Sequence, residues 1–175
     1  MDVRRIVIEE RKLLGLHVVG RRQELSHRVP LAWLDLTRMA SGIANRVDEN
    51  VYYGVFVDAD HAGDGHYRYW VATEVSSFGD RPEQLVELTI PAGTYAMVRV
   101  EGGPERIDEG YMALARAIGA ATGSASVTRY GFERYDVRRQ APTPPYERFD
   151  YDVYRPIAAT VHPHRGVTPV EAAPA

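Results

Sequence analysis

The sequence predicts an α+β fold built from two similar β-α-β-β halves that are related by a pseudo-two-fold axis. The first observation is that apolar and aromatic residues alternate with polar ones over several short segments, as in half-buried strands. The second is that the same order of elements occurs twice in 175 residues, about 80 residues apart, which is too long for a solenoid repeat. One helix per half is then available to cover one face of an antiparallel-rich sheet.

The first half begins with one or two strands in residues 3–20, where apolar residues alternate around a polar link. A helix is expected to start at Pro30, because proline is favoured at the first helical position. The apolar stripe of this helix consists of residues at helical spacing: Val29, Trp33, Leu36, Ala40 and Ile43. Two more strands follow at residues 50–57 and 67–75, and a polar loop joins them.

The second half repeats these elements in the same order. Residues 90–102 align without a gap with residues 8–20, at an offset of 82. A second helix is expected to start at Pro104, and its apolar stripe lies 78 positions after that of the first: Ile107, Tyr111, Leu114 and Ile118. Strands are expected at residues 128–136, where Tyr130-Gly131 repeats Tyr53-Gly54 at an offset of 77, and at residues 149–157.

These repeats predict a single domain over residues 1–157, with halves at 1–78 and 83–157. Residues 158–175 show no periodicity and are expected to form a disordered tail. Both helices are expected on one face of the sheet. The other face is expected to be curved and partly open, with a ligand cleft between the halves.

The strand at residues 128–136 carries the most informative residue. A period of two places Glu133 and Tyr135 on one face and Tyr130, Phe132 and Arg134 on the other. A carboxylate that lines an apolar cleft is costly unless it has a function. The repeat adds a second reason, since Glu133 falls on Phe56 at the offset of 77. The alternative is a solvated glutamate, or one paired with Arg134 or Arg139.

Composition excludes several classes of function. The absence of cysteine rules out disulfides, thiolate metal sites and a cysteine nucleophile. The net charge of -3 does not favour nonspecific binding of nucleic acid. The sequence contains no apolar run long enough to span a bilayer and no signal-peptide pattern, so a cytoplasmic location without membrane contact is expected. The acidic loop that starts at Asp58 lacks the ligand pattern of a calcium loop, and neither a metal nor a cofactor is expected.

Several segments together resemble the GyrI-like small-molecule-binding domain, which is also the effector-binding domain of AraC-type and MerR-type transcription activators. These segments begin at Ile90-Pro-Ala-Gly-Thr-Tyr, Tyr52-Tyr-Gly-Val, Tyr67-Arg-Tyr-Trp, Phe132-Glu-Arg-Tyr-Asp and Tyr151-Asp-Val-Tyr. The resemblance covers about residues 1–157 and implies a duplicated fold of the SOUL/haem-binding-protein type. No helix-turn-helix precedes residue 1 in the sequence, so a standalone binder without direct contact to nucleic acid is expected.

The resemblance also implies a ligand and a site. The ligand would be a lipophilic and in some members cationic molecule, held in an aromatic cleft with an acid at its base, as in multidrug binding. The acid of the family motif falls on Glu133, and the acid and tyrosine of the last strand fall on Asp152 and Tyr154. The expected ligand-binding residues are Glu133, Tyr135, Asp152, Tyr154, Tyr53, Phe56, Tyr69, Trp70 and Tyr95. Tyr69 and Trp70 point to opposite faces, and core packing is the preferred interpretation for Trp33.

Alternative functions remain open at the level of sequence. One is a hydrolase of cyclopropane-bearing DNA-alkylating compounds, with Glu133 as the base. Another is an interaction protein of the DNA gyrase inhibitor type. The sequence also leaves open whether two copies of the chain form a homodimer. Whether Arg155 pairs with Glu133 or with Asp152 is not decided by the sequence.

Overall fold

The computed structural model describes residues 1–57, 65–123, 130–146 and 148–157. The acidic loop that starts at Asp58 and the predicted tail after Ile157 therefore lie outside the described residues. The strands are β1 (Val3–Ile8), β2 (Arg11–Gly20), β3 (Val51–Val57), β4 (Tyr67–Val75), β5 (Val86–Ile90), β6 (Gly93–Gly102), β7 (Tyr130–Asp136) and β8 (Phe149–Pro156). The α-helices are α1 (Arg22–Met39) and α2 (Glu105–Thr122), and a 3-10 turn, η1 (Ala40–Gly42), follows α1.

The strand order shows the duplication directly. All eight strands form one antiparallel sheet in the order β1-β6-β8-β7-β3-β4-β2-β5. Each strand of one half and its equivalent in the other half occupy the same position in this order, counted from opposite ends. β3 and β7 pair at the centre, where Gly54 lies opposite Glu133 and Phe56 lies opposite Gly131. The predicted α+β fold with pseudo-two-fold symmetry is confirmed.

The outermost strands exchange partners between the halves, which the sequence analysis did not predict. β1 precedes β2 in the chain but pairs with β6, whereas β5 precedes β6 but pairs with β2. Each half therefore closes the edge of the other. Because of this exchange, strands of the two halves are hydrogen-bonded to each other at both ends of the sheet.

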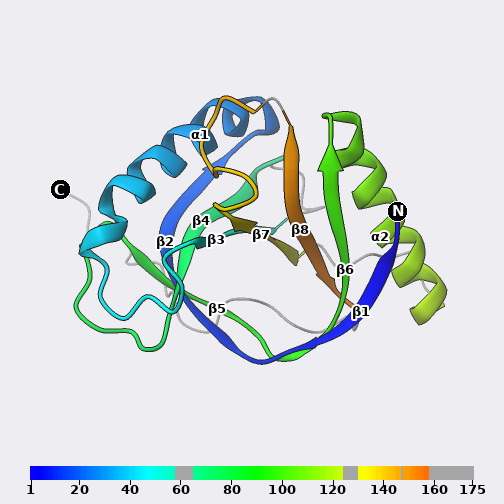
Figure 1. Ribbon diagram of the computed structural model, residues 1–175, viewed down its shortest axis with the longest axis horizontal. Helices are drawn as coiled ribbons and strands as arrows, with labels where there is room; N and C mark the ends of the chain where they lie inside the picture. The colour runs from blue at the N-terminus through cyan, green and yellow to red at the C-terminus, as the bar shows by residue number, and fades with distance from the viewer. Residues whose placement is uncertain (58–64, 124–129, 147, 158–175) are drawn as a thin grey trace.

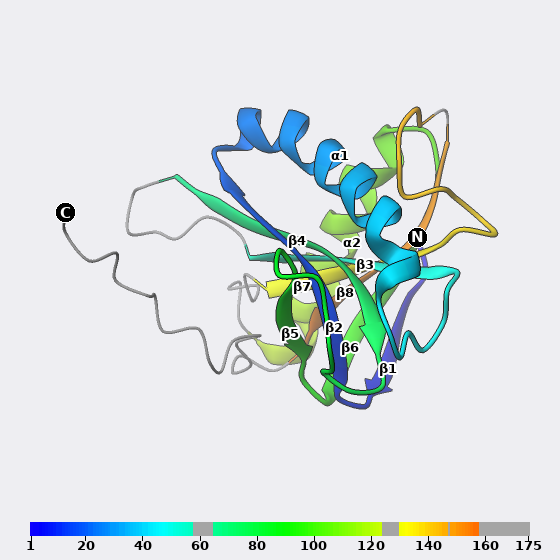
Figure 2. The ribbon, with the colours of Figure 1, turned by 90° about the vertical axis from the view of Figure 1, so that its left-hand side faces the viewer.

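Both helices lie on the outer face of the curled sheet (Figure 1). α1 packs on β2 and β4, and α2 packs mainly on β6. In the view turned by 90°, α1 runs along the top of the sheet and α2 lies behind the strands (Figure 2). Under α1 the core includes Leu14, Trp33 and Leu36, and under α2 it includes Val98 and Leu114.

Buried side chains on the inner face of the sheet form a core. This core contains residues from both halves: Ile8, Leu13, Val51, Tyr53, Val55, Trp70, Ala72, Leu88, Ile90, Tyr95, Tyr130, Phe132 and Tyr154. The pocket described below lies on the helix side of the sheet, whereas a ligand cleft on the face opposite the helices stays a prediction.

The start of the first helix also differs from the prediction. α1 begins at Arg22 instead of Pro30, so Pro30 lies inside the helix. The Glu24 carboxylate accepts a hydrogen bond of 2.8 Å from the backbone N–H of Arg21, which caps the earlier start. α2 begins directly after Pro104, as predicted, and ends at Gly123, whose left-handed backbone (φ 67°) closes the helix with an N–H bond to the carbonyl of Gly119.

Candidate functional site

The most informative cavity lies between the two helices, above the central strands. Its volume is about 330 Å³. Helix α1, helix α2, the central strands and the segment between β7 and β8 all contribute to its wall. The lining residues are Leu25, Ser26, Val29, Pro30, Trp33, Tyr69, Ile107, Tyr111, Glu133, Tyr135, Gln140, Tyr146, Phe149 and Tyr151. Eleven of these fourteen side chains are aliphatic or aromatic, and Glu133 supplies the only formal charge among them.

Three phenols hold the carboxylate of Glu133 in this pocket. Tyr69 on β4 donates to Oε2 at 2.5 Å, Tyr111 on α2 donates to Oε1 at 2.7 Å, and Tyr135 on β7 donates to Oε2 at 2.9 Å. These are the hydrogen bonds to the carboxylate from the described part of the chain, and none comes from an arginine or a lysine. Glu133 is 8% exposed. It is therefore a buried acid whose position is fixed by neutral donors.

Gly54 makes this arrangement sterically possible. It lies opposite Glu133 on β3. A Cβ atom at Gly54 would lie 2.0 Å from the hydroxyl oxygen of Tyr69 and 2.7 Å from Oε2 of Glu133. The backbone of Gly54 is not in the left-handed region. The glycine is therefore needed for close approach, and its conformational freedom is not the reason for it.

Burial dominates the electrostatics of the site. Desolvation raises the pKa of Glu133 above its ordinary value, while the hydrogen bonds from the three tyrosines and the charge of Arg155 act in the opposite direction. Burial also raises the pKa of Tyr69, Tyr111 and Tyr135 well above the usual range for a phenol. The three tyrosines therefore remain protonated and serve as donors over the physiological pH range.

Arg155 adds a positive charge below the pocket. It is 8% exposed, and its guanidinium carbon lies 4.9 Å from the ring centroid of Phe56 and 5.6 Å from that of Tyr111. Cation–π contacts of this kind stabilise a desolvated guanidinium. Asp152 instead pairs with Arg139 at 2.7 Å. Arg155 thus acts on Glu133 through space, and Asp152 has a different partner.

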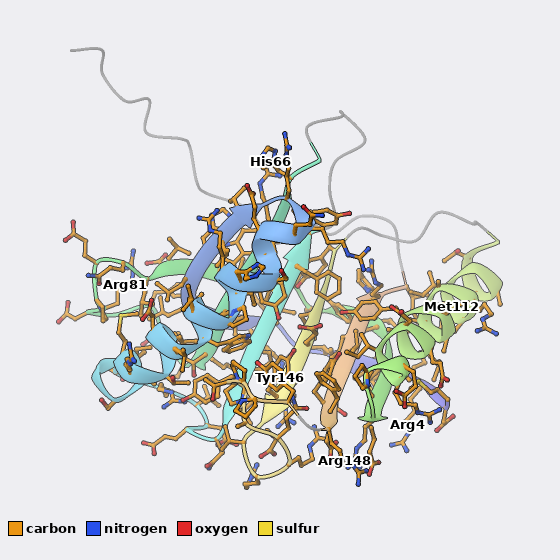
Figure 3. All side chains as sticks on the ribbon, turned by 90° about the horizontal axis from the view of Figure 1, so that it is seen from above. Arg4, His66, Arg81, Met112, Tyr146 and Arg148 are labelled. Carbon is orange, nitrogen blue, oxygen red and sulfur yellow. The ribbon has the colours of Figure 1, made fainter. Side chains whose placement is uncertain are left out.

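Aromatic rings form the walls. Tyr135 packs edge-on against Trp33 at 5.3 Å between centroids and stacks on Tyr151 at 4.9 Å. Phe149 packs edge-on against Tyr151. Seen from above, Tyr146 lies over the space between α1 and α2 (Figure 3). The pocket is thus a shallow aromatic enclosure with an acid at its base.

The structure brings together only part of the predicted ligand-binding set. Glu133, Tyr135 and Tyr69 all line the pocket. Phe56 lies on the same side of the sheet, buried against the ring of Tyr111 at 5.8 Å. Trp33 packs in the core, as predicted, and also forms part of the pocket wall.

The other predicted residues do not line this pocket, and their part in ligand binding stays a prediction. Tyr53, Trp70, Tyr95 and Tyr154 are in the core of the inner face. For Tyr154 the reason is the strand register, since it lies opposite Phe132 and stacks on it, which places Asp152 and Tyr154 on the face away from Glu133. Asp152 borders a separate, arginine-rich groove.

Six aromatic or polar residues of the pocket were not predicted from the sequence: Ser26, Tyr111, Gln140, Tyr146, Phe149 and Tyr151. Tyr111 had a detectable signal, because a hydroxyl on the buried stripe of a helix needs a partner. Tyr151 is the repeat equivalent of Tyr69 at the offset of 82. Tyr146 and Gln140 lie between strands and carried no periodic signal.

No membrane-crossing helix occurs among the residues that the structure describes, because neither helix is long and apolar enough. The described ranges also contain no cluster of three or more histidine, aspartate or glutamate residues that could hold a metal ion.

The curled duplicated sheet with one helix per half is also the fold of several solved bacterial proteins. Residues 5–157 match the family model described as integron-associated effector binding protein (Cass2). The chain belongs to this family. The match confirms the effector-binding family that the sequence motifs indicated.

Individual relatives agree with this assignment. The transcriptional regulator BrlR of Pseudomonas aeruginosa is 30% identical over 115 residues, which is 66% of this chain and 41% of that protein. The chain therefore spans less than half the length of this curated relative. SAV2435 bound to tetraphenylphosphonium has a TM-score of 0.60 at 16% identity, covering 89% of this chain and 93% of that one. An integron cassette protein of Vibrio cholerae has a TM-score of 0.57 at 10% identity, covering 88% and 94%.

Proposed function

We propose that the protein binds a small lipophilic cation in the pocket between α1 and α2. The observation that carries this proposal is the buried carboxylate of Glu133, held by three phenols and surrounded by aromatic rings. A ligand cation would supply the opposite charge that this carboxylate lacks among its hydrogen-bond partners. Coulombic attraction is strong in such a site because little water screens it.

The walls suit the apolar part of the same ligand. Rings of Trp33, Tyr135 and Tyr151 offer faces and edges for stacking and for cation–π contacts. The volume of about 330 Å³ is at the lower end of the range for small-molecule sites. A compact aromatic cation therefore fits better than an extended one. The structural likeness to SAV2435 bound to tetraphenylphosphonium supports this class of ligand.

Two ions of the same shape and opposite charge test the proposal. Tetraphenylphosphonium and tetraphenylborate would be titrated into wild type and into Glu133→Gln by calorimetry. Wild type should prefer the phosphonium, and the variant should lose about 1–3 kcal/mol of phosphonium binding, the scale of a charge-assisted contact.

Glu87→Gln is the matched control, because Glu87 lies on β5 and pairs with Arg81 at 2.7 Å, away from the pocket. It should leave both affinities unchanged. Equal binding of the two ions by wild type, or an unchanged phosphonium affinity in Glu133→Gln, would rule out the charge-based site.

A second candidate function rests on the raised pKa of Glu133. A carboxylate whose pKa is raised by burial is a stronger base than an exposed one, so it could activate a water for attack on a strained electrophile such as a cyclopropane. Ring-opened product formed by wild type and lost in Glu133→Gln would support a hydrolase. Product at the buffer rate with both proteins would exclude it while leaving the binding proposal intact.

A further inference from the structure

Gln140, in the segment that follows β7, has only half of its amide paired. Its Oε1 accepts a hydrogen bond from the backbone N–H of Asp150. This bond fixes which end of the amide carries the oxygen. The Nε2 atom is buried and has no hydrogen-bond partner among the described residues.

An unsatisfied buried donor of this kind is unusual. Most buried polar side-chain atoms are hydrogen-bonded, and leaving one unpaired costs about 1–3 kcal/mol. Gln140 is 9% exposed and is one of the residues that line the pocket. Tyr146, which also lines the pocket, uses its own hydroxyl to donate to the carbonyl of Pro142. The described surroundings therefore leave the Gln140 amide as a donor beside the pocket.

We propose that, on ligand binding, the Gln140 side chain shifts toward the cavity, so that its buried and unpaired Nε2 amide donates a hydrogen bond to an acceptor oxygen on the bound molecule. This inference rests on the proposed function, since it concerns the same pocket. It narrows the ligand class to an aromatic cation that also carries a carbonyl or ether oxygen. The Glu133 carboxylate attracts the positive charge of the ligand, whereas the Gln140 amide donates a hydrogen bond to an oxygen of the same ligand. The two side chains therefore recognise two different chemical features of one molecule.

Two phosphonium ions that differ only in the acceptor test the inference. (3-Methoxypropyl)triphenylphosphonium carries an ether oxygen, and pentyltriphenylphosphonium replaces it with a methylene group at the same chain length. Wild type should bind the ether compound about fivefold more tightly, the effect of one neutral hydrogen bond. In Gln140→Met this preference should disappear, because methionine has nearly the same length and no donor.

A second variant controls for a loss of local structure in Gln140→Met. Gln140→Glu keeps an oxygen that can accept from the Asp150 N–H, and at pH 8 it removes the donor, so the preference should disappear here too. Its added charge affects both probes equally, because they carry the same charge. Gln23→Glu on α1 makes the same chemical change outside the pocket lining and should keep the wild-type preference.

The outcomes separate the two proposals. Binding of both probes with equal affinity by wild type, or a preference that survives in both Gln140 variants, overturns the role of Gln140 and leaves the cation site standing. Satisfaction of the amide by a fixed water would give this result. Failure of wild type to bind either phosphonium overturns the cation site and the inference together.

Discussion

The two halves of the molecule share a backbone plan but differ in charge at their meeting point. On β3 the first half has Phe56, and on β7 the second half has Glu133 at the equivalent position. On β4 the first half has Thr73, which is fully buried, and on β8 the second half has Arg155, which is 8% exposed. Other equivalent positions are aromatic in both halves: Trp33 with Tyr111, and Tyr69 with Tyr151.

This comparison shows how a duplicated fold acquires a polar site. The glycine two residues before the differing pair is the same in both halves, and it serves the same steric purpose. Gly54 leaves room for Tyr69 and Glu133, and Gly131 leaves room for the ring of Phe56. The backbone thus provides two equivalent spaces, of which one holds a ring and the other an acid.

The largest expected effect comes from filling these spaces. A Cβ at Gly131 would lie 2.4 Å from Cζ of Phe56 and 2.8 Å from the carbonyl oxygen of Tyr154, and a Cβ at Gly54 would lie 2.0 Å from the Tyr69 hydroxyl. Gly131→Ala and Gly54→Ala should each lower the free energy of unfolding by about 3 kcal/mol in urea denaturation.

Rescue variants distinguish the two clashes. Tyr69→Phe should restore part of the stability of Gly54→Ala because it removes the hydroxyl, and Phe56→Leu should do the same for Gly131→Ala. Gly42→Ala is the control, since no atom lies within 4 Å of a Cβ built at Gly42. Wild-type stability in both Gly54→Ala and Gly131→Ala would contradict the steric account.

The next effect concerns the acid itself. The folded-state pKa of Glu133 is raised above its ordinary value of 4.5, mainly by desolvation. The unfolded chain therefore releases this proton at a lower pH than the folded chain does. As a result, the contribution of Glu133 to stability is fully present below about pH 4.5 and is lost as the pH rises through the folded pKa.

Glu133→Gln removes this titration and makes the first and second halves alike in charge at this position. Relative to wild type, the variant should gain about 1–2 kcal/mol of unfolding free energy between pH 4 and pH 8. Urea midpoints measured at pH 4, 6 and 8 check this. Parallel pH curves for the two proteins would show that the glutamate is not perturbed by burial.

The smallest effect concerns Arg155, the second charge that the first half lacks. Its charge lowers the pKa of Glu133 and partly offsets desolvation. Arg155→Met should therefore raise that pKa, so that the pH midpoint for binding tetraphenylphosphonium moves upward. Affinity near the midpoint should fall by about threefold, because a smaller fraction of the carboxylate is ionised.

Arg134→Met is the matched control for charge, since Arg134 lies on the same strand as Glu133 but approaches Asp152, at 3.9 Å. It should leave the midpoint where it is in wild type. A midpoint that moves equally in both variants would assign the effect to net charge instead of to the position of Arg155.

Much of the fold could be predicted from the sequence because its signals are local or repeated. Alternation and turns predicted the strands, and helical spacing predicted two helices. The start of α1 was misplaced because proline is usually a first-turn residue, whereas here the Glu24 cap precedes it. Period-two alternation correctly separated Glu133 and Tyr135 from Phe132.

The duplication, the two faces of each strand and the unusual acid at position 133 could all be predicted from the amino-acid sequence. That Glu133 lines a pocket on the helix side of the sheet, and that β1 and β5 are exchanged between the halves, is known only from the fold. The fold also assembled Tyr69, Tyr111 and Tyr135 around one carboxylate from three different elements. Alternation is a property of neighbouring residues, whereas the exchange of strands and convergence of distant side chains depend on long-range pairing.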